Sequence, residues 1–252
     1  MTPLTNSLIV LACVFGSALV GMFIRARLPE GYLNNDTGDV IKLALGLIVM
    51  MSALVLGLLI STAKSSYDLK RTQLTQLGAD VILMDRTLAL YGSATKEARN
   101  NLRDLAENLL EQFESFRGDR SKPESLEVKT GAKNFYQSVR ALAPRDSGQQ
   151  ALKDEAVRVS FGVAEIRALA LARESNSIPF PFLVILVFWL AVLFAGFGFF
   201  APPNCATVIA LAICALSVSV AIFLILQMDE PLTGLMRISL EPLRNAIDTL
   251  GG

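Results

Sequence analysis

Residues that most enzymes use for nucleophilic and acid–base catalysis are scarce in this sequence. The 252-residue chain contains no histidine, which excludes a Ser-His-Asp triad, a Cys-His pair and any histidine metal ligand. A carboxylate inside a membrane would be the remaining route, but no Asp or Glu lies within the long apolar runs. We therefore expect no enzyme, no catalytic or metal site and no cofactor. The same absence argues against a proton-coupled transporter.

Three cysteines and one acidic pair complete the candidates for site chemistry. Cys13, Cys205 and Cys214 lie in or beside apolar runs. The last two are nine residues apart on one expected helix, roughly 13 Å at the helical rise, which is too far for a disulfide. Asp229 and Glu230 could bind a cation, although a solvated helix end is the simpler explanation.

Four long apolar runs are the main structural elements that the sequence predicts. Residues 8–24, 43–63, 180–201 and 205–226 contain no Asp, Glu, Lys or Arg, and each is about long enough to cross a hydrocarbon layer of roughly 30 Å as a helix. Core helices of soluble enzymes are commonly shorter and keep a polar edge. A cleaved signal peptide is an alternative for the first run, but no Lys or Arg precedes that run. The sequence predicts an all-α integral membrane protein with four transmembrane helices.

Apolar residues at alternating three- and four-residue spacing predict a helical domain between the second and third spans. No proline occurs between Pro29 and Pro123, so the second span can continue to about Tyr91, where Gly92 and Ser93 end it. Further helices are expected after residue 96, around Phe135, and from about 149 to 173. The first seam, typical of a coiled coil or bundle, consists of Leu74, Leu77, Val81, Met84, Leu88 and Tyr91.

These elements divide the chain into four parts. A transmembrane hairpin (1–63) precedes a cytoplasmic helical domain (64–177), a second hairpin (178–228) and an amphipathic tail (229–252). The tail stripe suits either the membrane surface or the helical domain; its members are Met236, Leu240, Leu243, Ile247 and Leu250.

Basic residues near the spans indicate the orientation. With four spans, both termini and the helical domain share one side of the membrane. That side is predicted to be cytoplasmic because it carries more of the basic residues: Lys64, Lys70, Arg71, Arg167, Arg173, Arg237 and Arg244, against Arg25 and Arg27 on the other side.

Small residues at every fourth position allow close helix approach inside a membrane. The sets are Ala12 and Gly16, Ser17 and Gly21, Ala53, Gly57 and Ser61, and Ala206, Ala210 and Cys214. Packing within one chain explains this spacing, and a subunit contact or a pore face is the alternative.

Two segments resemble the bestrophin-like family of bacterial tetraspan membrane proteins, and the resemblance covers essentially the whole chain. The first segment, YDLKRTQLTQLGADVILMDRTLALYGSATKEARNNL, starts at Tyr67. The second, MDEPLTGLMRISLEPLRNAI, follows the fourth span. The family's motif positions correspond to Asp85, Leu88, Tyr91, Gly92 and Arg99 in the first segment and to Asp229, Pro231, Gly234, Ser239 and Pro242 in the second.

The resemblance implies a homo-oligomeric channel in the bacterial inner membrane. True bestrophins are pentameric anion channels with cytosolic termini and a pore lined by their second transmembrane helix. A pentamer that conducts small anions is therefore the expected assembly. Calcium gating is not implied, because this chain lacks the dense acidic cluster that binds calcium in animal bestrophins. The zero net charge gives no indication of nucleic acid as a partner.

Lys42 and Lys64 bracket the second span and would form rings of ammonium groups in a closed oligomer. A ring at the cytoplasmic mouth raises the local anion concentration, although Lys64 could also simply anchor the helix at the headgroups. The candidate pore-lining residues are Met50, Leu54, Gly57, Ser61, Thr62 and Lys64. The alternative function is a non-conducting membrane scaffold or sensor whose helical domain binds a partner.

Overall fold

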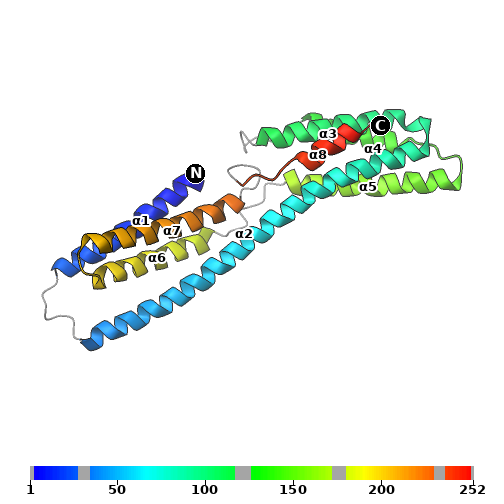
Figure 1. Cartoon of the computed structure of the whole chain (residues 1–252). Coiled ribbons are helices and arrows are strands. Elements are labelled where there is room, and N and C mark those ends of the chain that lie inside the picture. Colours follow the sequence, from blue (N-terminus) through cyan, green and yellow to red (C-terminus); the bar gives the residue numbers. More distant parts are fainter. Residues whose placement is uncertain (1–2, 28–34, 117–125, 172–179, 230–235, 251–252) are drawn as a thin grey trace. The chain divides into compact units, whose positions relative to one another are not determined.

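The computed structural model describes residues 3–27, 35–116, 126–171, 180–229 and 236–250. Within these ranges the secondary structure is helical, with no strand (Figure 1). The elements are α1 (Pro3–Arg27), α2 (Asn35–Tyr91), the 3₁₀ turn η1 (Ser93–Thr95), α3 (Lys96–Phe116), α4 (Leu126–Arg140), α5 (Ser147–Leu171), α6 (Phe180–Phe200), α7 (Cys205–Asp229) and α8 (Glu241–Thr249).

The chain forms two compact units, and α2 contributes residues to both. One unit comprises Met1–Ser66 and Ser175–Glu230, and the other comprises Tyr67–Glu174 and Pro231–Gly252. We call them the apolar unit and the helical unit. The expectation that the second span continues without a break to Tyr91 is confirmed, because α2 is one helix of 57 residues.

Four helices are long and apolar enough to cross a membrane, in agreement with the four charge-free runs. They are Leu4–Arg27, Gly38–Tyr91, Pro181–Phe200 and Cys205–Asp229. In α2 the apolar part lies at the N-terminal end, and the remainder belongs to the helical unit.

Helices α1 and α6 approach closely in the apolar unit because glycines occupy their contact. A Cβ atom at Gly21 would lie 2.0 Å from the carbonyl oxygen of Ala195, and one at Gly198 would lie 2.0 Å from that of Ala18. No side chain fits in such a gap, so the small residue at position 21 serves packing within the chain. A buried hydrogen bond of 2.7 Å from Ser219 Oγ to the Ser7 carbonyl ties α7 to α1.

Other small-residue sets remain unused within the chain. Ala53, Gly57 and Ser61 on α2 are exposed, and so are Ala206, Ala210 and Cys214 on α7. For these two sets, packing inside one chain is the wrong explanation. Their surfaces are left for lipid or for another protein chain.

The helical unit is built around the predicted seam of α2. All six members of that seam are buried, and they pack with apolar residues of α3, α4 and α5. Helix α3 has an apolar stripe that is buried from Ala98 to Phe113, and α5 contributes Ala156, Val159 and Val163. Burial of this one face explains why the segment is helical, since helices within proteins gain most of their stability from tertiary packing.

The tail belongs to the helical unit rather than to a membrane surface. Leu240, Leu243, Ile247 and Leu250 are buried in the same core as the α2 seam. Helix α8 crosses α2 so closely that a Cβ at Gly78 would lie 2.6 Å from the carbonyl oxygen of Pro242. An ion pair between Arg244 and Glu114 adds a contact from α8 to α3.

Candidate functional site

The first motif segment runs through the end of α2, the turn at η1 and the start of α3. Gly92 ends α2 with φ +117°, a left-handed conformation that side chains disfavour. The Thr95 hydroxyl lies 2.6 Å from the Leu88 carbonyl oxygen and 2.7 Å from that of Gly92. It can therefore satisfy carbonyls that the end of α2 leaves without helical partners.

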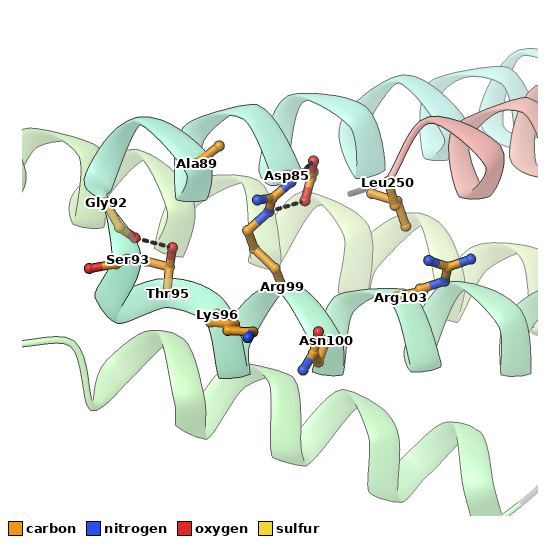
Figure 2. A pocket seen from close by; sticks show the side chains of 10 residues that line it. All are labelled: Asp85, Ala89, Gly92, Ser93, Thr95, Lys96, Arg99, Asn100, Arg103 and Leu250. Carbon is orange, nitrogen blue, oxygen red and sulfur yellow. Dashed lines mark hydrogen bonds and ion pairs between the residues drawn. The ribbon is translucent and has the colours of Figure 1, made fainter. Parts of the chain in front are cut away.

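Asp85 and Arg99 form a two-pronged ion pair that holds α2 against α3. Arg99 Nε donates to one carboxylate oxygen at 2.6 Å and Nη2 donates to the other at 2.9 Å (Figure 2). The Asp85 side chain is 11% exposed and that of Arg99 is 27% exposed. The hydrogen bond with Asp85 raises the pKa of Arg99, and burial opposes this only in part. The guanidinium consequently stays charged at any physiological pH.

Tyr91 anchors the same turn by its backbone and its ring. Its carbonyl accepts a hydrogen bond of 3.2 Å from Gln149 Nε2 of α5. The ring is buried in the core with the residue 4% exposed. Its hydroxyl has no hydrogen-bond partner among the described residues, so the tyrosine serves here mainly as an apolar side chain.

A cavity of about 470 Å³ opens beside this turn. Figure 2 shows side chains from α2, η1 and α3 around it, with Leu250 of the tail at one side. The lining residues are Asp85, Ala89, Gly92, Ser93, Thr95, Lys96, Arg99, Asn100, Arg103 and Leu250. Three motif positions, Asp85, Gly92 and Arg99, therefore line a single cavity.

The candidate pore residues lie on the apolar part of α2. Met50 and Leu54 are 74% and 76% exposed, Gly57 has no atom within 4 Å of a hypothetical Cβ, and Ser61 and Lys64 are exposed. These residues follow one another at three- and four-residue intervals and so share one face of the helix. Thr62 is partly buried and lies beside this face.

Lys42 has partners within its own chain. Its Nζ lies 2.9 Å from Asp39 Oδ1 and 5.9 Å from the centroid of the Phe200 ring. A neighbouring carboxylate reduces the field that a ring of lysines could produce at this end of α2.

Comparison with known sequences decides the family. The model of a family described as the bestrophin-like domain matches residues 12–243. The chain belongs to the bestrophin-like family. It is thus a membrane protein of a channel family, as the resemblance of its two motif segments predicted.

The fold of this bestrophin-like chain is also similar to a solved structure. That structure is the crystal structure of a bacterial bestrophin homolog from Klebsiella pneumoniae that carries a point mutation. The TM-score is 0.62 at 14% sequence identity, and the match covers 97% of this chain and 99% of the other. No curated protein sequence matches the chain.

The tail motif of this bestrophin-like protein is divided between the two units. Asp229 ends α7 in the apolar unit, whereas Pro242 is an early residue of α8 in the helical unit. Ser239 Oγ accepts a hydrogen bond of 3.2 Å from the Glu241 N–H. Pro231 and Gly234 lie outside the described residues, as does Glu230 of the acidic pair.

Sequence reasoning missed several residues around the α2–α3 turn. Thr95 and Gln149 hold the turn, while Lys96 and Arg103 join Arg99 at the cavity. The three basic residues follow at three- and four-residue spacing and so were visible as a face of α3. Nothing in the spacing showed that Leu250 would complete the cavity wall.

Proposed function

We propose that this bestrophin-like protein forms a homo-oligomeric channel, with a pentamer as the expected assembly, that conducts anions through an axial pore lined by α2. The termini and the helical unit would lie in the cytoplasm and the apolar unit in the bacterial inner membrane. The basic residues near the spans support this orientation, and the bilayer and further copies of the chain are the expected partners.

The poor coverage of α2 by its own chain carries the proposal. In the most apolar stretch of α2 only 11% of the residues are buried, against 28%, 28% and 22% in the other three spans. The exposed face bears glycine, serine and lysine beside large apolar residues. A helix that faces only lipid has no need of serine or lysine. On a pore face, serine supplies a hydroxyl donor and lysine places positive charge at the mouth.

Apolar and basic parts of this face would have separate roles. The stretch from Leu47 to Leu58 can become wetted or dewetted and so gate conduction. At the mouth, the ammonium groups of Lys64 would concentrate anions, and Ser61 would offer a hydroxyl donor just inside.

A change of charge at Lys64 tests the proposal. Purified protein in planar bilayers, with chloride and potassium gradients, should give a reversal potential close to that of chloride. Lys64→Glu should shift the reversal potential toward that of potassium. Cation-selective current in the unchanged protein would refute the role of Lys64, and absence of current from assembled protein would refute the channel.

A non-conducting scaffold is the alternative, and one observation favours it. An apolar cavity of about 340 Å³ lies between α3, α4 and α5. Phe161 at its edge is 59% exposed and packs against Tyr136, with ring centroids 5.7 Å apart. Such a cavity resembles the grooves that receive apolar side chains of partner helices. Assembled protein without current would favour this function.

A further inference from the structure

The cavity at the α2–α3 turn has an excess of positive charge. Its lining includes the cations Lys96, Arg99 and Arg103 and one carboxylate, Asp85, which leaves an excess of two positive charges. The three cations lie on one face of α3 because they are three and four residues apart. The chain as a whole has zero net charge, so this excess is a local feature.

The basic groups remain able to donate to a ligand. A guanidinium has five N–H donors, and Arg99 uses two of them on Asp85. Arg103 donates from Nε to Glu107 at 3.0 Å. This contact is exposed, and it leaves the two terminal NH₂ groups of Arg103 able to donate to a ligand. Lys96 is exposed and makes no ion pair among the described residues. Because Asp85 already holds the Arg99 guanidinium in one orientation, a ligand that binds there would restrict the Arg99 side chain little further.

The remaining wall suits an organic molecule rather than a bare ion. Ala89 and Leu250 present apolar surface, and Asn100 and Ser93 add neutral polar groups. A volume of about 470 Å³ lies within the range of roughly 300–1,000 Å³ that is typical of small-molecule sites.

We propose that this cavity binds a small organic phosphate monoester. A monoester carries about −1.5 to −2 charges at neutral pH, opposite in sign to the excess of the lining, and its three terminal oxygens can accept hydrogen bonds from guanidinium groups. The attached organic group would lie against Ala89 and Leu250. Because the wall combines α2, α3 and the tail, the ligand would hold the end of the tail against the helix that continues the second span.

Calorimetric titration of the purified full-length protein in nanodiscs tests this site without any measurement of conduction. The probes are AMP and glycerol 3-phosphate, with adenosine and glycerol as matched compounds that lack the phosphate. We expect the two phosphates to bind and the two neutral compounds not to bind. Lys96→Glu combined with Arg103→Glu should weaken binding by roughly a hundredfold, about tenfold for each charge-assisted hydrogen bond that the substitutions remove.

Lys133→Glu provides the control for added negative charge, because this exposed lysine on α4 lies outside the cavity lining. It should leave the affinity within about twofold. Retention of the native melting temperature by the double variant would show that weaker binding does not reflect unfolding. Lys96 and Arg103 are both exposed, so we expect the double variant to fold.

Two further titrations distinguish a soluble phosphate monoester from a lipid headgroup as the natural ligand. Soluble monoesters that bind in phosphatidylcholine nanodiscs would identify a soluble metabolite as the ligand class. Binding of phosphatidic acid alone, weakened in the double variant, would assign the same chemistry to a lipid headgroup. The proposal is overturned if no phosphate compound binds, if the double variant binds as well as the unchanged protein, or if adenosine binds as tightly as AMP.

Discussion

At the scale of single residues, the Asp85–Arg99 pair is the contact that most directly links the motif to the fold. The two residues are 14 positions apart and lie on different helices. Their bidentate geometry fixes both the distance and the rotation of α3 relative to α2 at this point. The same pair lines the cavity, so it supports the structure and the proposed site together.

Removal of both partners should destabilise the helical unit by less than the sum of the two single removals. Asp85→Ala leaves a partly buried guanidinium without its carboxylate, which should lower stability by about 1–3 kcal/mol. The double variant with Arg99→Ala should be less destabilised than the sum of the single variants, with a coupling of roughly 1–2 kcal/mol. Thermal unfolding in detergent would measure this cycle, and strict additivity would contradict a direct interaction.

The Tyr91 hydroxyl leads to the opposite expectation. It is buried, and no described residue accepts or donates a hydrogen bond to it. Tyr91→Phe removes a polar group that would otherwise need solvation, so stability should stay within about 0.5 kcal/mol or rise. Tyr91→Ala should cost roughly 3–5 kcal/mol through the cavity that it leaves. A large drop of melting temperature in Tyr91→Phe would reveal a partner for the hydroxyl.

At the scale of elements, the crossing of α2 and α8 explains a glycine inside a long helix. Gly78 lies on the buried side of α2, and a Cβ there would meet the backbone of Pro242 rather than a movable side chain. Glycine is unfavourable within a helix by about 1 kcal/mol relative to alanine. At this position, close approach of the tail outweighs that preference.

Alanine at position 78 should therefore loosen the tail. We expect Gly78→Ala to destabilise the α8 contact by about 1–3 kcal/mol, because the backbone of α8 must shift. Hydrogen exchange of α8, followed by mass spectrometry, would show faster exchange in the variant. Gly162→Ala on α5 is the control, since its Cβ would meet only Asp80 Oδ2 at 3.8 Å, and it should be neutral or slightly stabilising. Unchanged exchange in Gly78→Ala would contradict this packing.

At the scale of the whole molecule, the exposed face of α2 is where we expect copies of the chain to meet. The tail is buried in the core of the helical unit, so its removal is not a clean test of assembly. Truncation after Asp229 would expose the core of that unit, so dissociation of the assembly could follow from unfolding. A substitution on the apolar part of α2 avoids this complication.

Gly57→Leu should weaken or abolish the homo-oligomer while leaving each chain folded. The substituted side chain meets nothing in its own chain, because no atom lies within 4 Å of a Cβ at this position. It would crowd the neighbouring α2 helices around the proposed axis, where small residues allow close approach. Gly16→Leu on α1, which also meets no atom within 4 Å, is the matched control. Native mass spectrometry from membranes would compare the variants, and an intact assembly in Gly57→Leu would place the interface elsewhere.

The sequence alone determined the features that depend on local pattern. The absence of charge over four runs predicted the apolar helices, and the lack of proline after the second run predicted the continuous helix α2. The apolar seam from Leu74 to Tyr91 predicted which face is buried. These features follow from hydration of charge, from backbone geometry and from the helical repeat, all of which act between neighbours in the chain.

Only the tertiary structure decided which distant residues meet. The stripe on the tail was amphipathic whether it covered a membrane or a protein core, and the close crossing at Gly78 shows which surface it covers. The pairing of Asp85 with Arg99 and the closure of the cavity by Leu250 likewise depend on how separate helices pack. A helical repeat fixes the faces of one helix, whereas the match between faces depends on the shapes of all the side chains that share the core.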